Sequence, residues 1–220
     1  MIRPPADEGE LLARAVDLSG FTLDELAARR RLRVPAESRR AKGFAGQLLE
    51  SMLGATAGSR AEPDFPGLGV ELKTVPIDAA GRPLESTYVC VAPLDPVALG
   101  PWERAWVRRK LRRVLWLPLV RAERLGDAMV GSPLLWSPDE VEDAALRADY
   151  DELLDLLASG EVARIDGRFG RVLQLRPKGA DAEDRTWALD EDGDLVRDTA
   201  RGFYLRPAFT GGVLARLSAG

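Results

Sequence analysis

Two carboxylates and a lysine occur in this chain at a spacing that can bring them together on one strand. Asp64 follows a proline, and the triplet Glu71-Leu72-Lys73 begins seven residues later. Side chains two residues apart share one face of a strand, so we expect Glu71 and Lys73 to project together, while Leu72 takes the other face. Asp64 can lie at the start of a neighbouring strand or at the mouth of the same one. The charged groups would then meet at one end of a sheet.

Such a group suits metal-assisted hydrolysis of a phosphodiester. Two carboxylates can hold one or two hard divalent cations, and the backbone carbonyl of Leu72 can complete the ligand shell. The metal lowers the pKa of a bound water, while Lys73 can orient that water and add positive charge. Glu50, on the helix expected before Asp64, is a candidate third acid. The motif by itself also fits a solvent-facing strand edge that carries a salt bridge.

The composition narrows the possible chemistry. The chain has 220 residues, no histidine and one cysteine. It therefore lacks the imidazole of Ser-His-Asp and Cys-His nucleophile systems and of HExxH zinc sites, and it can form no internal disulfide or cysteine-rich zinc module. Oxygen ligands favour Mg²⁺, Mn²⁺ or Ca²⁺ over zinc, so we expect a hard divalent cation. The single cysteine fits a reducing cytoplasm.

The formal charge of −4 hides an uneven distribution. The segment from Arg104 to Arg113 contains six basic residues and no acid, whereas Pro138 to Asp155 and Asp181 to Asp198 each contain eight acids. A basic stretch is ordinarily a solvated helix face, and contact with nucleic acid is the sharper interpretation. We expect a basic amphipathic helix here, which fits either interpretation.

Hydrophobic periodicity predicts a mixture of helices and strands. Helices are predicted from Glu8 to Leu18, from about Ala45 to Gly54 and from Pro138 to Ala158. Another begins at Thr22, with Glu25 at the capping-box position. This last segment, TLDELAARR, fits either two packed helices of a larger fold or a helix-turn-helix, although Pro35 interrupts the place of a recognition helix.

Strands are predicted at residues 68–77, 86–94, 114–120, 161–166 and 171–177, and the first two are joined by a turn at 81–83. We expect a largely contiguous sheet in the middle of the chain. The acidic segment from Asp181 is expected to be an exposed loop, and the run RGFYLRPAFTGGVLARL to end in a short helix.

The length allows one large domain or two small lobes. The start, MIRPPADEGE, has no apolar signal segment, and no apolar run approaches the roughly 18 residues of a membrane span. We expect a cytoplasmic monomer with no membrane association.

The spacing of Asp64 and Glu71-Leu72-Lys73 is that of the PD-(D/E)xK nucleases, and the likeness to one family of them extends along nearly the whole chain. The chain resembles the MutH family of methyl-directed mismatch-repair endonucleases in KGFAGQLLESMLGATAGSRAEPDFPGLGVELKTVPIDAAGRPLESTYVCVAPL. The likeness continues, in order and with similar spacing, through LLARAVDLSGFTLDELA, WVRRKLRRVLWLPL, VGSPLLWSP, LQLRPK and RGFYLRPAF. The acidic segment from Asp181 and the tail LARLSAG depart from the family pattern.

This resemblance implies an α/β fold of the restriction-endonuclease type, in which a mixed central sheet is flanked by helices and two lobes form a DNA-binding cleft. Residues 1–220 would form a single nuclease domain, with a catalytic lobe over about 1–120 and a DNA-reading lobe over about 121–220. The implied activity is Mg²⁺-dependent nicking of the unmethylated strand at hemimethylated GATC sites. MutL would activate the enzyme, and MutS would act through the repair complex.

Positions that match the family's motifs take their expected catalytic roles from the resemblance. Asp64 and Glu71 are expected as metal ligands and Lys73 as the catalytic lysine. Glu50 resembles the helical acid that completes the metal site. Lys110, in RRKLRR, resembles a further active-site lysine that contacts phosphate near the scissile bond.

The expected DNA-binding roles come from the same resemblance. Arg176 would read guanine in the major groove, where an arginine can make two hydrogen bonds to O6 and N7. Pro177 would hold that loop, and Tyr204 would lie next to adenine N6 and sense a methyl group by steric exclusion. Contacts to the DNA backbone or the rest of the interface are expected from Lys42, Glu85, Tyr88 and Lys178.

Two other functions fit parts of the sequence. A type II restriction endonuclease would share the core motif and cut both strands at GATC, whatever the methylation state. A non-catalytic DNA-binding regulator would use the TLDELAARR segment and show no Mg²⁺-dependent nicking.

Overall fold

The computed structural model describes residues 2–36, 43–58, 60–177, 185–190 and 192–218. The chain divides into two compact units, of which the first comprises Met1–Glu85, Arg113–Ser137 and Thr210–Gly220, and the second comprises Ser86–Arg112 and Pro138–Phe209. The chain thus passes between the units more than once, whereas the sequence predicted a single boundary near residue 120. None of the described helices is long and apolar enough to cross a membrane.

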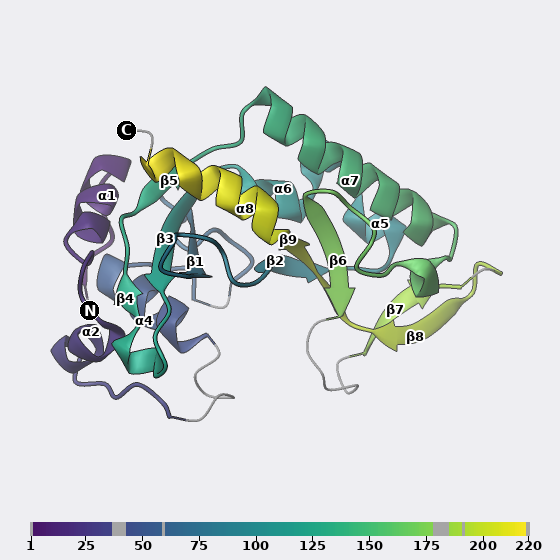
Figure 1. The fold of residues 1–220 in the computed structure, drawn as a ribbon. Coiled ribbons are helices and arrows are strands. Elements are labelled where there is room, and N and C mark those ends of the chain that lie inside the picture. The colour runs from purple at the N-terminus through teal and green to yellow at the C-terminus, as the bar shows by residue number, and fades with distance from the viewer. Residues whose placement is uncertain (1, 37–42, 59, 178–184, 191, 219–220) are drawn as a thin grey trace. The chain divides into compact units, whose positions relative to one another are not determined.

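The first unit is built on a mixed four-stranded sheet (Figure 1). Its elements are α1 (Glu8–Val16), α2 (Leu23–Arg29), α4 (Phe44–Leu53), β1 (Glu71–Ile77), β3 (Val114–Val120), the 3-10 helix η2 (Leu125–Asp127), β4 (Met129–Val130), β5 (Leu134–Trp136) and the 3-10 helix η4 (Ala215–Ser218). Strand β3 pairs with β1 in parallel and with β4 and β5 in antiparallel fashion. The expected α/β class, with a mixed sheet flanked by helices, is confirmed.

The second unit contains a three-stranded antiparallel sheet in the order β2-β9-β6 and a separate hairpin, β7-β8. Its elements are β2 (Thr87–Ala92), α5 (Pro96–Leu99), the 3-10 helix η1 (Trp102–Arg104), α6 (Trp106–Leu111), α7 (Glu140–Ala158), the 3-10 helix η3 (Val162–Arg164), β6 (Leu173–Pro177), β7 (Arg185–Leu189), β8 (Leu195–Thr199) and β9 (Arg201–Leu205). Helix α8 (Pro207–Leu214) crosses the boundary between the two units.

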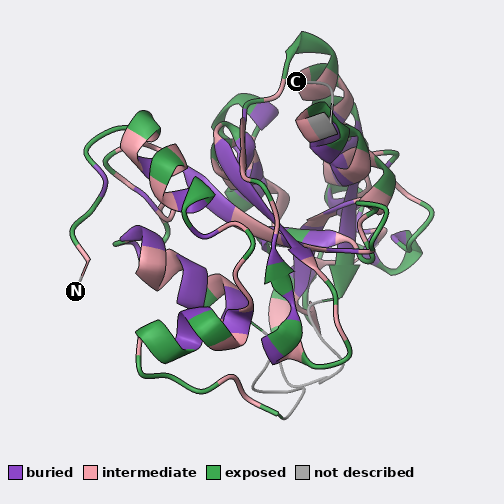
Figure 2. Cartoon of the chain, turned by 60° about the vertical axis from the view of Figure 1, so that its left-hand side comes forward, coloured by how far each residue is buried: buried purple, intermediate pink, exposed green. Residues whose placement is uncertain are grey.

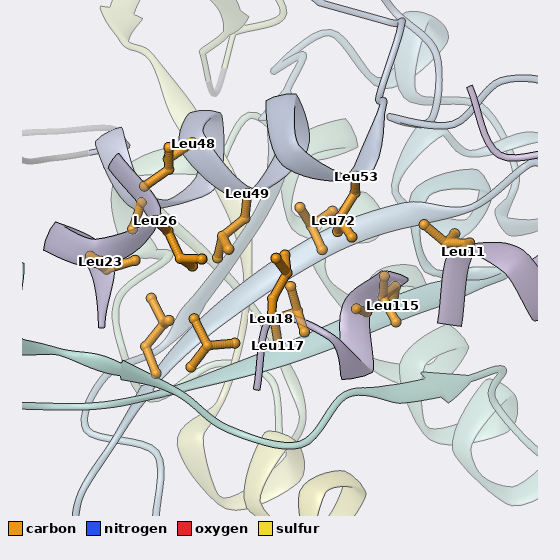
Figure 3. Close-up of a cluster of buried hydrophobic side chains, with 14 of the residues drawn as sticks. Leu11, Leu18, Leu23, Leu26, Leu48, Leu49, Leu53, Leu72, Leu115 and Leu117 are labelled. Atoms are coloured by element: carbon orange, nitrogen blue, oxygen red, sulfur yellow. The ribbon is translucent and has the colours of Figure 1, made fainter. Parts of the chain in front are cut away.

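Leucines from the helices and strands of the first unit meet in one hydrophobic core (Figure 3). The labelled members are Leu11, Leu18, Leu23, Leu26, Leu48, Leu49, Leu53, Leu72, Leu115 and Leu117. Complete burial of a side chain of this size contributes about 1.5–3 kcal/mol. This core holds α1, α2 and α4 against β1 and β3, and the helices carry buried residues on one side and exposed ones on the other (Figure 2).

Helix α2 begins as its sequence predicts. The side chain of Thr22 accepts a hydrogen bond from the Glu25 backbone N–H, and the Glu25 carboxylate accepts one from the Thr22 backbone N–H at 2.8 Å. This reciprocal capping box satisfies two N–H groups that lack partners inside the helix. Leu23, Leu26 and Ala27 are buried in the core, as expected for packed helices of a larger fold.

The expectation of one largely contiguous sheet is wrong. The turn near Gly81 closes with a bridge between Ile77 and Pro83, but β1 and β2 do not pair. Strand β1 instead joins β3, and β2 joins β9 in the other unit. A tight turn between two apolar runs predicts a hairpin, and here distant strands outcompete that local pairing.

The prediction of a strand at residues 161–166 is also wrong, because this segment contains the 3-10 helix η3. Its two buried side chains, Val162 and Ile165, are three residues apart. That spacing suits one turn of helix better than the alternation of a strand.

The acidic segment from Asp181 is not simply an exposed loop, because β7 and β8 form a hairpin within it. Three of its acids lie in the turn, where the Asp190 carboxylate accepts hydrogen bonds from the backbone N–H groups of Asp192 and Asp194. Gly193 provides the positive φ of 82° that the turn needs. The many acidic residues indicated a loop, although the residues of β7 and β8 on either side of the turn include types that favour strands.

Tyr150, on α7, is buried in the second unit and titrates far from its ordinary range. Its hydroxyl donates to the carbonyls of Leu99 and Gly100, at 3.0 and 2.9 Å. Its ring packs against Trp102 and Phe203, with centroid distances of 5.3 and 5.7 Å. Burial raises the pKa of the phenol to about 12, from an ordinary value of 10.0.

This raised pKa predicts a specific weakness at high pH. The contribution of the neutral phenol to stability is complete below pH 10, and it is lost as the pH rises from 10 toward 12. Tyr150→Phe is expected to lower the free energy of unfolding by about 1–3 kcal/mol at pH 8, because the buried Leu99 carbonyl and the part-buried Gly100 carbonyl lose this donor. The variant is also expected to lose less further stability between pH 10 and 12 than the unchanged protein does. Denaturant unfolding over this range measures both effects, and an identical pH dependence in the two proteins would contradict the assignment.

Candidate active site

A tight turn brings Asp64 back to the strand that carries the other candidate residues. Phe65 and Val70 form an isolated antiparallel bridge, in which each backbone N–H donates to the carbonyl of the other, at 2.9 and 3.3 Å. Both side chains are buried, and Gly69 has a φ of 67°, which favours glycine in the turn. The bridge places Asp64 beside the start of β1, the second of the two positions that the sequence allowed.

The Asp64 carboxylate accepts a backbone hydrogen bond at the open edge of β1. Strand β1 pairs only with β3 in its sheet, and the Glu71 N–H donates to the Arg113 carbonyl, on the β3 side, at 2.9 Å. Backbone groups alternate in direction along a strand, so the N–H and C=O of Leu72 face away from β3. The Leu72 N–H donates to Asp64 Oδ2 at 2.8 Å. One carboxylate and the Leu72 carbonyl therefore lie along the same strand edge.

Glu71 and Lys73 form an ion pair on one face of β1. Lys73 Nζ lies 2.8 Å from Glu71 Oε1. The pair is largely withdrawn from water: the Lys73 side chain is 11% exposed and the Glu71 side chain is 4% exposed. The predicted common face of these two residues is confirmed. The alternative of a solvent-facing strand edge accounts for the edge position but not for this burial.

The residues at this edge suit a hard divalent cation. Asp64 and Glu71 can supply carboxylate oxygens and Leu72 a backbone carbonyl, and Mg²⁺ typically binds one or two carboxylates while keeping several waters. Glu50 lies half-buried on α4, which packs against β1. Among the described residues, however, no three acidic or cysteine side chains are placed together as a metal-holding group. The structure thus pairs Glu71 with Lys73, places the Asp64 carboxylate on the backbone of the intervening Leu72, and carries Glu50 on the neighbouring helix α4.

Lys110 belongs to the second unit, where it lies on α6. Its Nζ is 5.2 Å from the centroid of the Trp106 ring, and the Arg109 guanidinium is 5.0 Å from the same centroid. The expected basic helix is shorter than predicted, because η1 precedes it and α6 ends at Leu111. The neighbouring Arg108 pairs with Asp143 of α7 at 3.2 Å.

The expected base-reading residues are adjacent in the second unit. Arg176, at the end of β6, lies 5.6 Å from the centroid of the Tyr204 ring, and its Nη1 donates to the Ser86 hydroxyl at 2.9 Å. The rings of Tyr88 and Tyr204 meet edge to face at 5.3 Å. Burial raises the pKa of Tyr204, against an opposing effect of the Arg176 charge, so its phenol stays protonated at neutral pH.

The other residues expected to contact DNA are exposed or lie outside the described residues. Pro177 is exposed at the end of β6, opposite Arg201. Glu85 is exposed and is the last residue of the segment Met1–Glu85 of the first unit. Lys42 and Lys178 lie outside the described residues.

Comparison with known proteins identifies the family of the chain. A family model described as DNA mismatch repair enzyme MutH matches residues 53–149. The DNA mismatch repair proteins MutH of Salmonella paratyphi B and Salmonella typhimurium are each 52% identical over 218 residues, covering 98% of this chain and 94% of each relative. The MutH of Escherichia coli O17:K52:H18 is 52% identical over 219 residues, covering 98% of this chain and 95% of the relative.

The chain belongs to the MutH family. The resemblance inferred from the motifs is confirmed, and the chain is an endodeoxyribonuclease of DNA mismatch repair. The interpretation as a non-catalytic DNA-binding regulator is therefore wrong.

Two supports of the MutH site were missed in the sequence analysis. The Arg113 carbonyl accepts a hydrogen bond from the Glu71 N–H. The Arg113 guanidinium donates to Glu8 of α1, and this hydrogen bond lowers the pKa of the Glu8 carboxyl. Asp149 is a buried acid on α7 that accepts backbone N–H groups at the start of β6, from Arg171, Val172 and Leu173. The sequence marks Asp149 only as one acid among eight in its segment, because its neighbours at residues 171–173 are distant along the chain.

The Glu71–Lys73 pair predicts a specific coupling in stability. Lys73→Met is expected to lower the free energy of unfolding by about 3 kcal/mol, because it leaves a buried carboxylate without this partner. Adding Glu71→Gln to that variant is expected to restore much of the loss, since the uncompensated charge is then gone. Denaturant unfolding of both variants and of Glu71→Gln alone completes the double-mutant cycle. Additive effects of the two changes would contradict a direct coupling.

Proposed function

We propose that this MutH-family endonuclease nicks the unmethylated strand at hemimethylated GATC sites, that it requires Mg²⁺, and that MutL activates it. Family membership supports the activity, and the withdrawal of Glu71 and Lys73 from water next to Asp64 is the structural observation that supports this site. A buried ion pair is weak evidence for stability alone, which favours a catalytic reason for its presence.

The candidate metal ligands are Asp64, Glu71 and the Leu72 carbonyl. A divalent cation bound there would supply a water of lowered pKa and positive charge for the scissile phosphate, and Mn²⁺ is the expected substitute. Glu50, half-buried on α4, is the candidate third acid.

The chain's own contribution to chemistry is positioning and charge. Lys73 Nζ is held 2.8 Å from Glu71, and this ammonium would orient the attacking water and stabilise the negative charge that develops on the phosphate. Lys110 would contact phosphate near the scissile bond. No histidine is needed in this scheme, in agreement with the composition.

The second unit would read the DNA. Arg176 would donate two hydrogen bonds to guanine, and Pro177 would shape its loop. Tyr204 would lie beside adenine N6 and favour one methylation state by steric exclusion. Further contacts to DNA are proposed for Lys42, Glu85, Tyr88 and Lys178.

Nicking assays on defined duplexes test the proposed activity. With Mg²⁺ and MutL, the unmethylated strand of a hemimethylated GATC duplex is expected to be nicked, and a fully methylated duplex to remain intact. Asp64→Asn and Lys73→Met are each expected to slow nicking by about 10²–10³-fold, because each removes a group that stabilises the transition state. Glu123→Gln, an exposed acid of the same unit, is the matched control.

The cleavage pattern separates this proposal from the type II alternative. Double-strand cutting at GATC whatever the methylation state would contradict the proposed nicking and support a type II restriction endonuclease. Rapid nicking without MutL would contradict the activation, and full activity of Asp64→Asn would refute the site.

Arg176→Ala tests base reading separately from catalysis. The variant is expected to lose about 1–3 kcal/mol of discrimination against duplexes in which the guanine is replaced, as for a lost bidentate contact. Arg171→Ala, an exposed arginine before β6, serves as the control. Competition binding to GATC and substituted duplexes at one salt concentration measures the ratio. An equal loss of affinity for all sequences would make Arg176 a phosphate contact instead.

A further inference from the structure

The surroundings of Arg176 show how its guanidinium is held. One of its terminal nitrogens, Nη1, donates to the Ser86 hydroxyl at 2.9 Å, and the guanidinium lies 5.6 Å from the centroid of the Tyr204 ring. A guanidinium has five N–H donors, so one bond to Ser86 leaves several for a base. Both contacts come from within the second unit, and they restrain a long side chain that is otherwise exposed.

Tyr88 lies next to a β-bulge and faces the same place as Arg176, across from Tyr204. The register of β2 against β9 shifts between Tyr88, which lies opposite Tyr204, and Cys90, which lies opposite Phe203. Bulges of this kind re-aim a side chain away from the regular alternation. The Tyr88 ring meets the Tyr204 ring edge to face at 5.3 Å and remains 38% exposed.

Gly202 provides the room for this arrangement. It lies on β9, opposite Arg176 of β6 on one side and Val91 of β2 on the other. A Cβ at Gly202 would come within 2.8 Å of Tyr88 Cε2 and 3.1 Å of the Cys90 carbonyl oxygen. The carbonyl belongs to the backbone of the neighbouring strand and cannot yield as a ring can, so any side chain here would push Tyr88 or the strand away.

We infer that Ser86 and Gly202 are positioning residues for sequence and methylation reading, because they set Arg176 and the Tyr88–Tyr204 pair in place within the protein itself. This inference rests on the proposed reading role of Arg176 and Tyr204. Ser86 orients the arginine, and Gly202 admits the ring of Tyr88 beside Tyr204. Holding a binding group in one conformation strengthens binding by reducing the entropy lost when the partner arrives.

The Ser86 variants test the orientation of Arg176. Ser86→Ala is expected to lower the ratio of nicking rates on GATC and guanine-substituted duplexes by about two- to tenfold, the factor associated with immobilising one long side chain. Ser86→Thr retains the hydroxyl and is expected to retain the ratio. Affinity for random DNA is expected to be unchanged in both variants, which separates a reading effect from a loss of fold.

Gly202→Ala tests the space beneath the rings. It is expected to lower the ratio of nicking rates on hemimethylated and fully methylated GATC duplexes, because Tyr88 can no longer pack beside Tyr204. Gly212→Ala, where a Cβ would meet nothing within 4 Å, is the control. Thermal unfolding of each variant shows whether the fold is intact, and Tyr88→Ala, which removes the same ring contact without crowding the backbone, gives the same expected loss if Gly202→Ala fails to fold.

Arg176→Ala, measured in the same assay, distinguishes the possible failures. If it lowers guanine discrimination while Ser86→Ala does not, the positioning role of Ser86 is overturned and the proposed reading role stands. Unchanged methylation discrimination in Gly202→Ala or Tyr88→Ala overturns the role of Gly202. If Arg176→Ala leaves guanine discrimination unchanged, the reading assignment is wrong and the inference fails with it.

Discussion

The parallel pairing of β1 with β3 is the constraint on which the candidate active site depends. It commits the Glu71 N–H to the Arg113 carbonyl and thereby turns the backbone groups of Leu72 toward the open edge. An unpaired strand edge leaves backbone donors and acceptors in need of partners. Asp64, returned by the Phe65–Val70 bridge, satisfies the Leu72 N–H and places its carboxylate where a cation could share it.

The same strand carries charge where a purely structural strand would carry apolar side chains. Glu71 and Lys73 are largely buried, and burial of an ion pair gains little over well-packed apolar residues. Proteins retain such arrangements where function needs them, at a cost in stability that the rest of the fold must offset. In this unit the leucine core beneath α1, α2 and α4 can supply that stability.

Local patterns predicted the parts of the fold that are governed by short-range physics. The capping box at Thr22, the buried run of β3 and the common face of Glu71 and Lys73 all follow from spacings of two to four residues. The choice of strand partners did not follow, because β2 pairs with β9 more than a hundred residues away. The β7–β8 hairpin was missed because its acidic turn dominated the composition.

The site shows the same division between local and distant information. The shared face of Glu71 and Lys73 could be predicted from their spacing, whereas the roles of Asp64, Glu71, Lys73 and Glu50 stay predictions. Ser86 and Gly202 lie within segments that resemble the family, but the sequence assigned them no role of their own. Their importance is visible only when the strands place them beside Arg176 and Tyr204.

The central claim is that the open edge of β1 is the divalent-cation site. Electron paramagnetic resonance of Mn²⁺ titrated into the protein measures binding directly, without requiring DNA or turnover. We expect Asp64→Asn to weaken Mn²⁺ binding by about ten- to a hundredfold or more, because it removes one of two carboxylate ligands, and Glu123→Gln to leave it unchanged. Equal Mn²⁺ affinity in the unchanged protein and in Asp64→Asn would contradict the account.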